Sequence, residues 1–213
     1  GWGDGGGLML KRVVPALVGA VLVAAVIGIA ARYWGGDTPP SAGGAGNAAV
    51  PPISGTVQNF TPTNPGRPAP IDRFYDAGGQ ELTLQGFGNK VVLVNLWATW
   101  CAPCLKELPS LDRLQAQLGS DRFQVVAISV DRRGVEAVRP YFEKLKIAHL
   151  ALYVEPEGHL AQSVGLQVLP STIVVDPRGL MLGKLIGAAE WDAPEALALV
   201  QHYVDQANKV TQN

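Results

Sequence analysis

The sequence predicts an α/β domain in which a mixed β-sheet carries helices on both of its faces. Two observations lead to this prediction. From residue 71 onward, short apolar runs alternate with segments whose apolar residues recur at helical spacing. Near the C-terminus, two apolar runs follow each other directly across a turn sequence, which predicts an antiparallel hairpin. Strands joined by helices together with a terminal hairpin require a sheet with both parallel and antiparallel neighbours.

The first half of this region contains two predicted strands and two predicted helices. Residues 91–94 are all valine or leucine, which is typical of a strand covered on both faces. Residues 123–130 predict a second strand and residues 135–146 a second helix. Between the two strands we expect a helix with one apolar face. Its leucines recur every three or four residues, at Leu105, Leu108, Leu111, Leu114 and Leu118.

The second half predicts a short strand, a short helix, a hairpin and a final helix. Residues 150–154 are expected to form the strand, and residues 159–164 the short helix. The runs 172–175 and 180–186 flank Asp176-Pro177-Arg178-Gly179, a sequence typical of a turn. The final helix is expected to extend to about residue 207. We expect a capping box at its start, because Asp192 is followed three residues later by Glu195.

Composition excludes several classes of protein. The 213 residues carry 17 Lys and Arg against 18 Asp and Glu, whereas a nucleic-acid binder needs a clear excess of basic side chains. Only two cysteines are present, which is too few for a disulfide-rich scaffold or a four-cysteine zinc site. The three histidines are scattered along the chain. We therefore expect no metal site.

A long apolar stretch precedes the domain. Residues 13–31 contain no charge, and as a helix they would span about 28 Å, close to the thickness of a bilayer core. Lys11 and Arg12 come just before this stretch, which favours an N-terminus on the cytoplasmic side. We expect residues 1–12 to be cytoplasmic and residues 13–32 to be a transmembrane anchor. A cleaved secretory signal is the alternative, and both interpretations place the rest of the chain outside the cytoplasm.

A segment rich in glycine and proline follows the apolar stretch. Residues 35–70 contain seven Gly and eight Pro but only two charged residues. Such a composition offers too little apolar surface to offset the entropy lost on ordering. We therefore expect residues 33–70 to be a flexible linker and residues 71–213 to form the folded domain.

The chemistry of the chain is concentrated at Cys101 and Cys104. They lie in the sequence Trp-Cys-Ala-Pro-Cys, directly after the first predicted strand and at the start of a helix. The free N–H groups and dipole of a helix N-terminus stabilise a thiolate, so Cys101 is predicted to be the nucleophile and Cys104 the resolving thiol. Pro103 suits the first helical turn. A purely structural disulfide is the alternative, but closing so short a loop constrains the unfolded chain very little.

Around these cysteines the sequence resembles the membrane-anchored TlpA/ResA/CcmG group of thioredoxin-fold thiol–disulfide oxidoreductases, and TlpA most closely. The resemblance is carried by residues 95–104, by Pro109, and by Leu169-Pro170 ahead of a later strand. It implies a thioredoxin fold with an inserted helix and strand between residues 131 and 152. It also implies that Pro170 is a cis-proline facing the two sulfurs, and that Leu169 offers its backbone to a substrate.

The same resemblance implies roles for residues beside the cysteines. Trp100, Ala102 and Pro103 would contact the substrate. Trp97 would help to wall the site, with core packing as the alternative, and Pro109 would kink the active-site helix.

Two further positions distinguish this chain from thioredoxin. Thioredoxin has a buried aspartate where this chain has Asn95, which cannot accept a proton, whereas the anchored group has a glutamate at the position of Glu107. On a helix, residues i and i+3 share a face, so Glu107 can lie near Cys104. A partly buried carboxylate there could exchange the proton of the resolving thiol. The alternative is a solvated carboxylate, because Lys106 beside it indicates an exposed side of the helix.

The resemblance implies a periplasmic reductase without a bound cofactor. Its clients would be the disulfides of apocytochromes c, or of copper-oxidase (CuA) subunits and their copper chaperones. Its electrons would come from a membrane reductant of the DsbD/CcdA type. Ala102 and Pro103 supply no charge that would stabilise the thiolate, which favours a reducing couple. Two alternatives stay open: a copper or metal carrier that uses the two cysteines, and a general disulfide oxidase of the same fold.

Overall fold

The computed structural model describes residues 50–165 and 168–211. The chain divides into two units between residues 48 and 49, and only the second unit is described. The expected cytoplasmic segment, the anchor at residues 13–32 and the first part of the expected linker lie outside the described residues. Among the helices that are described, none is long and apolar enough to cross a membrane.

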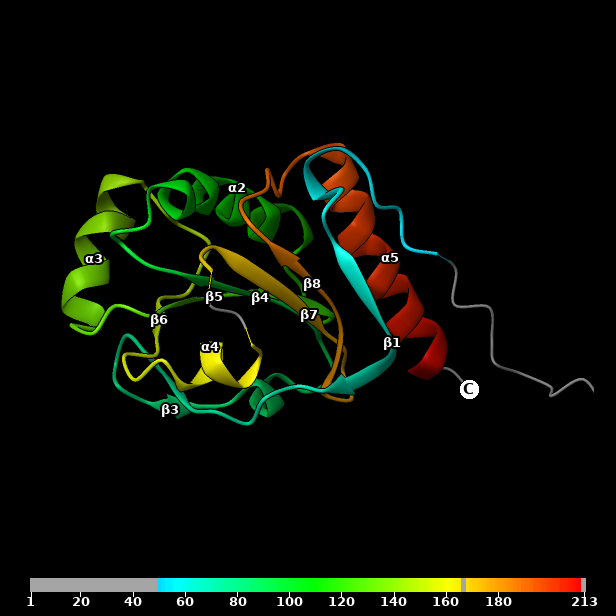
Figure 1. Cartoon of the computed structure of the whole chain (residues 1–213), viewed down its shortest axis with the longest axis horizontal. Coiled ribbons are helices and arrows are strands. Elements are labelled where there is room, and N and C mark those ends of the chain that lie inside the picture. The colour runs from blue at the N-terminus through cyan, green and yellow to red at the C-terminus, as the bar shows by residue number, and fades with distance from the viewer. Residues whose placement is uncertain (1–49, 166–167, 212–213) are drawn as a thin grey trace, which may run out of the picture. The chain divides into compact units, whose positions relative to one another are not determined.

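An eight-stranded mixed sheet organises the domain, with the strand order β1-β8-β7-β4-β5-β6-β2-β3 (Figure 1). At its centre β4 (Val91–Trp97) runs parallel to β5 (Phe123–Ser129) and antiparallel to β7 (Ser171–Val175). The prediction of a mixed sheet is therefore confirmed. The strands predicted at residues 91–94 and 123–130 form this centre, where both faces are covered.

The remaining strands extend the sheet in both directions. On one side, β8 (Leu180–Ile186) pairs antiparallel with β7 and with β1 (Thr61–Pro68), which forms one edge. On the other side, the two-residue strand β6 (Tyr153–Val154) pairs parallel with β5. Beyond it lie β2 (Phe74–Asp76) and β3 (Glu81–Leu82), both antiparallel to their neighbours. The predicted hairpin is confirmed as β7 and β8.

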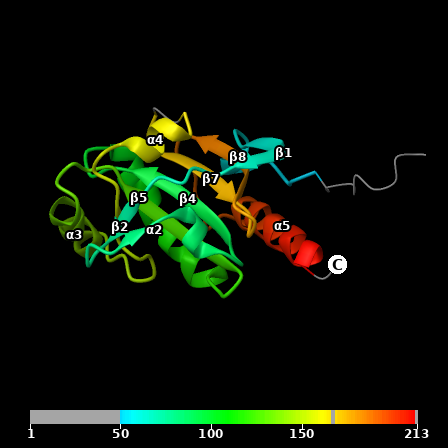
Figure 2. The same ribbon diagram turned by 90° about the horizontal axis from the view of Figure 1, so that it is seen from below.

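Helices cover both faces of the sheet (Figure 2). One core cluster contains α2 (Ala102–Leu118), α3 (Val135–Lys144) and α5 (Pro194–Thr211), and the other contains α4 (His159–Ser163) and the 3-10 helix η2 (Leu84–Phe87). Strand β4 contributes alternate side chains to the two clusters, because successive residues of a strand point to opposite faces. Val91, Leu93 and Trp97 join the first cluster; Val92, Val94 and Leu96 join the second.

The prediction that the linker reaches residue 70 is wrong for its last part. Residues 61–68 form β1, and the 3-10 helix η1 (Gly55–Val57) precedes it. Val57 and Phe60 are buried in the first core cluster, and the ring of Phe60 packs 5.8 Å from that of Tyr203. Backbone hydrogen bonds to β8 and two apolar anchors thus order a segment whose composition alone predicts disorder. Its prolines are tolerated because β1 is an edge strand.

The strand predicted at residues 150–154 is shortened to β6. The segment before it is held by a side chain instead of by a neighbouring strand. The backbone N–H groups of Ala148, His149 and Leu150 donate to Oδ1 of Asp112 on α2, at 3.2, 2.7 and 2.9 Å. Leu150, the first residue of the predicted strand, therefore has no N–H left for a strand ladder.

The last helix begins at Pro194 rather than at the predicted capping box. The carboxylate of Asp192 forms an ion pair with Arg113 on α2, with Nε and Oδ2 2.6 Å apart. The carboxylate of Glu195 accepts a hydrogen bond from the N–H of Thr56, at 3.0 Å. Both acidic side chains therefore bind partners distant in the sequence, which no local pattern could reveal.

Candidate active site

The two cysteines form a disulfide at the point where β4 gives way to α2. Cys101 is the N-cap of α2, and its sulfur accepts a hydrogen bond from the N–H of Cys104 at 3.3 Å. Cys101 is 6% exposed and Cys104 is 1% exposed. Both cysteines are thus buried, the slightly more exposed one at the helix N-terminus and the other one turn further on, with Pro103 in the first helical turn.

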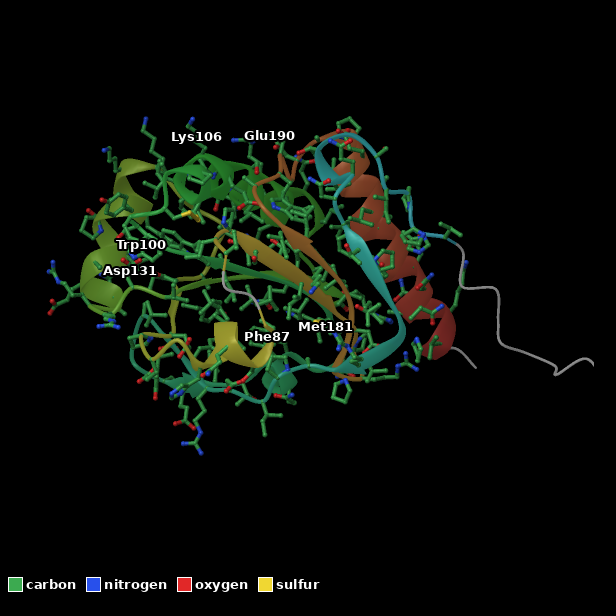
Figure 3. All side chains as sticks on the ribbon, viewed as in Figure 1. Phe87, Trp100, Lys106, Asp131, Met181 and Glu190 are labelled. Carbon is green, nitrogen blue, oxygen red and sulfur yellow. A yellow bond between two sulfur atoms is a disulfide. The ribbon has the colours of Figure 1, made fainter. Side chains whose placement is uncertain are left out.

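A buried aspartate fixes the turn in front of Cys101. Asp131 follows β5 and accepts hydrogen bonds from the N–H and the hydroxyl of Thr99, at 2.8 and 2.6 Å. It also accepts one from the hydroxyl of Ser129, at 2.6 Å. Figure 3 shows Asp131 and Trp100 at the same end of the sheet. No role for Asp131 is predicted from the sequence. The available signal was an acidic residue directly after a strand parallel to β4, since such strands end at the same edge of a sheet.

The Leu169–Pro170 peptide bond is cis, as the family resemblance implied. The loop that contains it is tied to the far end of β8, because the carbonyl oxygen of Pro170 accepts a hydrogen bond from the N–H of Gly187 at 2.9 Å. Pro170 is buried, whereas Leu169 is only half-buried.

A groove of about 340 Å³ is formed in part by Trp100, the residue before Cys101. Trp100 and Leu169 line it together with Arg132, Glu157 and Ala161. Trp100, next to Cys101, leaves 71% of its surface exposed. The groove therefore combines apolar surface with one basic and one acidic side chain, and one of its walls is the residue that precedes Cys101.

The two tryptophans near the cysteines have different environments. In contrast to Trp100, Trp97 is completely buried, and its ring stacks 6.1 Å from that of Phe142 on α3. Its surroundings are those of a core residue. Ala102 and Pro103 are exposed at the start of α2, and Pro109 is half-buried within the same helix.

Glu107 is a buried carboxylate with three hydrogen-bond donors. It is 2% exposed, so the alternative of a solvated side chain is wrong. Its Oε1 accepts from the indole N–H of Trp191 at 2.5 Å and from the N–H of Ala189 at 3.1 Å. Its Oε2 accepts from Nδ2 of Asn95 at 3.3 Å. Burial raises the pKa of Glu107 to about 7, because it outweighs the three donors that favour the charged form.

Asn95 can adapt to either protonation state of Glu107. Its Nδ2 also donates to the hydroxyl oxygen of Thr172 at 3.0 Å, while its buried Oδ1 has no partner in the described structure. A side-chain amide contains both a donor and an acceptor. A turned amide could therefore accept a hydrogen bond from a protonated Glu107.

Sequence reasoning missed Trp191 and Ala189. They are 84 and 82 residues from Glu107 in the chain, and no motif connects them to the cysteines. Only the return of the chain from β8 to α5 brings them to α2. In the described part of the chain, no group of three or more His, Cys, Asp or Glu side chains is arranged to hold a metal ion.

Comparison with known proteins agrees with this geometry. Residues 55–197 match the model of the redoxin family. The thiol-disulfide oxidoreductase ResA of Bacillus thuringiensis subsp. konkukian is 26% identical over 125 residues, which are 57% of this chain and 69% of that protein. The thioredoxin-like protein YneN of Bacillus subtilis is 27% identical over 118 residues, which are 54% of this chain and 68% of that protein.

Solved structures show the same fold. A thiol:disulfide interchange protein from Bacteroides sp. superposes with a TM-score of 0.56 at 26% identity, covering 68% of this chain and 93% of that one. A thioredoxin family protein from Chlorobium tepidum gives a TM-score of 0.54 at 23% identity, covering 67% and 99%. The predictions of a thioredoxin-like fold and of a thiol–disulfide oxidoreductase are confirmed by these relatives. Because the family model matches well over half of its residues, this chain belongs to the redoxin family.

Proposed function

We propose that the protein is a thiol–disulfide reductase of the TlpA/ResA/CcmG type that acts on disulfides of partner proteins outside the cytoplasm. The observation that carries the proposal is the placement of Cys101. Cys101 is the N-cap of α2, and its sulfur accepts a hydrogen bond from the N–H of Cys104. It directly follows Trp100, whose side chain is exposed. A helix N-terminus favours the thiolate over the thiol. Cys101 is thus prepared as a nucleophile at a surface where a partner chain can dock.

The reduced dithiol would transfer two electrons in two exchange steps. The Cys101 thiolate attacks one sulfur of the partner's disulfide. A mixed disulfide forms, the partner's S–S bond breaks, and its other sulfur leaves as a thiolate that takes a proton from water. The sulfur of Cys104 then attacks Cys101. The Cys101–Cys104 bond forms and the partner departs with both sulfurs reduced. The disulfide in the structure is the oxidised end of this cycle.

In the second step Glu107 would take the proton of Cys104. The two residues are three positions apart on α2 and are both buried on its inner side. A group exchanges protons best when its pKa lies near the working pH, and the pKa of Glu107 is raised to about 7. Glu107 would return the proton when the dithiol is regenerated.

The groove beside Trp100 would receive the partner's chain on one side of its cysteine. Trp100 and Leu169 offer apolar contact, and the backbone of the loop before Pro170 can bind an extended segment. Arg132 and Glu157 place opposite charges along the groove. Such charges favour partners whose own charges are complementary in position.

We further propose that the domain is tethered to the cytoplasmic membrane on its outer face. The uncharged stretch at residues 13–31 and the Gly- and Pro-rich segment after it support this arrangement. A tether raises the effective concentration towards clients at the same membrane. The resemblance noted above supports two client classes, apocytochromes c and copper-oxidase subunits with their chaperones, and a membrane dithiol reductant as the source of electrons.

We infer the direction of electron transfer from the residues between the two cysteines. Ala102 and Pro103 bring no charge to the sulfur, and Pro103 lacks an N–H. The thiolate of Cys101 thus has the helix N-terminus but no further charge to stabilise it, which leaves the disulfide form relatively stable, so we expect a reduction potential below about −200 mV. Redox titration against glutathione and dithiothreitol measures it. A value near about −120 mV, typical of a strong oxidant, would contradict the proposal.

The experiment that tests the function is partner trapping. Cys104→Ser leaves Cys101 able to attack but unable to be released, so mixed disulfides accumulate in membranes. Cys101→Ser is the matched control and should trap nothing. Adducts with apocytochromes or copper-oxidase proteins support the proposal and choose between the clients. Copper bound in equimolar amount by the unaltered protein, together with the absence of any adduct, would instead favour the metal carrier.

A further inference from the structure

The loop between β8 and α5 contacts several distant parts of the domain. We call residues 187–193 the bridging loop. Four of its backbone N–H groups donate to four different partners, none of which is adjacent in the sequence. These hydrogen bonds are Gly187 to the carbonyl oxygen of Pro170 (2.9 Å), Ala189 to Glu107 Oε1 (3.1 Å), Glu190 to Thr56 Oγ1 (2.7 Å) and Trp191 to Ser110 Oγ (3.0 Å).

The bridging loop also has two side-chain anchors. Trp191 is completely buried, and its indole N–H donates to Glu107. Asp192 forms a two-point ion pair with Arg113 on α2, with N–O distances of 2.6 and 3.2 Å. Every anchor lies either on α2, on the cis-proline loop or on the N-terminal segment. The position of the loop therefore depends on all three at once.

We propose that the bridging loop is a positioning device for the active site. Trp191 and Ala189 fix the carboxylate of Glu107, and Gly187 ties the bridging loop to the loop that contains Pro170. This inference rests on the proposed role of Glu107 in handling the proton of Cys104. Trp191 touches neither sulfur in any described contact, so it is a positioning residue rather than a catalytic one.

Thr56 holds the outer side of the bridging loop. Its hydroxyl oxygen accepts the N–H of Glu190, and its own N–H donates to Glu195 at the start of α5. Figure 1 shows this N-terminal segment crossing the end of α5 next to the loop. Because Glu190 lies between Ala189 and Trp191, Thr56 restrains the residue between the two donors to Glu107. The segment that leads into the domain thus stabilises the loop around the active site.

Several charged groups near Glu107 can also influence its pKa and have to be considered in a test. Glu190 on the bridging loop raises the pKa of Glu107 through its negative charge, although less than burial does. Arg113 and Asp192 neutralise each other in their ion pair. Lys106 is exposed on α2, and Figure 3 shows it at the same end of the domain as Glu190. In the reduced protein, Cys104 is the further titrating group on the same side of α2.

Trp191→Phe tests the proposal directly. The change keeps an aromatic ring but removes the donor that favours the charged carboxylate, so the pKa of Glu107 should rise by about one unit. The titration of a ¹³C-labelled carboxyl group, assigned with Glu107→Gln, measures it by NMR. Trp97→Phe is the matched control. It removes an indole that is equally buried but whose N–H has no partner in the described structure, so the Glu107 titration should not move.

Thr56→Val provides a second test at a half-buried position, and the change keeps the size and the backbone N–H of the residue. Loss of the hydroxyl acceptor should accelerate hydrogen exchange at the N–H groups of Ala189 and Trp191 by about threefold to tenfold. Thr61→Val, on the exposed edge strand β1, is the control and should leave both rates unchanged. Equal rates in Thr56→Val and the unaltered protein would overturn the proposed restraint.

The readouts separate this inference from the proposed function. If Trp191→Phe leaves the Glu107 titration in place, the bridging loop does not position the carboxylate and the inference fails, whatever the enzyme does. If the titration moves but the pH profile of disulfide reduction does not follow it, the loop positions Glu107 as inferred and the proposed proton role of Glu107 fails. If the Glu107 titration and the pH profile shift together, the result supports both the inferred positioning and the proposed proton role of Glu107.

Discussion

Burial of the Glu107 carboxylate lowers the stability of the fold but also raises the pKa of this group. A buried carboxylate is expensive because it loses its hydration. Three N–H donors, from Trp191, Ala189 and Asn95, recover part of that cost for the charged form. Burial still dominates, so the pKa is raised to about 7. The folded protein therefore holds a proton at Glu107 over a pH range in which the unfolded chain has released it.

This proton makes stability depend on pH. Below pH 4.5 both states are protonated, so the ionisation of Glu107 contributes nothing to the pH dependence. Between pH 4.5 and about 7 only the unfolded state ionises, so the free energy of unfolding falls as pH rises, and above about 7 the loss is complete. Glu107→Gln cannot ionise. From pH 4.5 to 8, the difference in unfolding free energy should therefore move in favour of the glutamine variant by about 3 kcal/mol.

Urea unfolding at four pH values across this range measures the difference. Glu143→Gln, on the exposed side of α3, is the control and should show no comparable gain. A Glu107→Gln curve that stays parallel to that of the unaltered protein would mean that the folded state does not retain the proton.

At the scale of elements, side chains decide where regular structure stops. The strand predicted at residues 150–154 is reduced to its last two residues, and Asp112 on α2 takes the N–H of Leu150 together with those of the two residues before it. A similar principle operates before α2, where Asp131 accepts hydrogen bonds from the N–H and the hydroxyl of Thr99. In each case a buried carboxylate on one element fixes the loop of another.

Replacement of Asp112 tests this role. Asp112→Ala leaves three N–H groups without their acceptor, and we expect the free energy of unfolding to fall by about 2–4 kcal/mol. Asp112→Asn keeps an oxygen at the Oδ1 position and should lose less than half as much. Urea unfolding at pH 7 compares the two variants. Equal losses would show that the carboxylate fills space rather than holding the loop.

At the scale of the whole molecule, the domain begins earlier than its composition indicates. Strand β1 covers the edge of β8, and Val57 and Phe60 fill part of the core beside α5. The ring of Phe60 lies against Gly183, where a larger residue would collide with it. The N-terminal segment is thus a structural part of the domain and also connects it to the preceding residues.

Truncation tests the boundary. A chain that begins at residue 71 loses three buried apolar side chains, those of Val57, Phe60 and Ala69, and exposes the edge of β8. We expect its free energy of unfolding to be lower by about 3 kcal/mol or more than that of a chain that begins at residue 50. Chemical denaturation of the two chains measures the difference. Equal stabilities would restore the boundary that the composition suggested.

Much of the centre of the fold could be predicted from sequence because its signals are local. Leu108, Leu111 and Leu114 recur at helical spacing and are all completely buried. The turn at residues 176–179 is set by Asp176, which accepts the N–H groups of Arg178 and Leu180. The positions of Cys101 and Cys104 at the start of α2 could be predicted because an apolar strand, the cysteine pair and a helical pattern follow one another directly in the sequence.

The sequence by itself thus determined the alternation of strands and helices, the central sheet and the cysteine pair at a helix N-terminus. These features depend on periodicity and on neighbours within a few residues. The tertiary structure alone decided that β1 joins the sheet, that Asp112 replaces a strand ladder, and that Trp191 and Ala189 surround Glu107. Each of these rests on a hydrogen bond or a packed contact between segments far apart in the chain. Such contacts exist only once the chain has folded, so no local pattern records them.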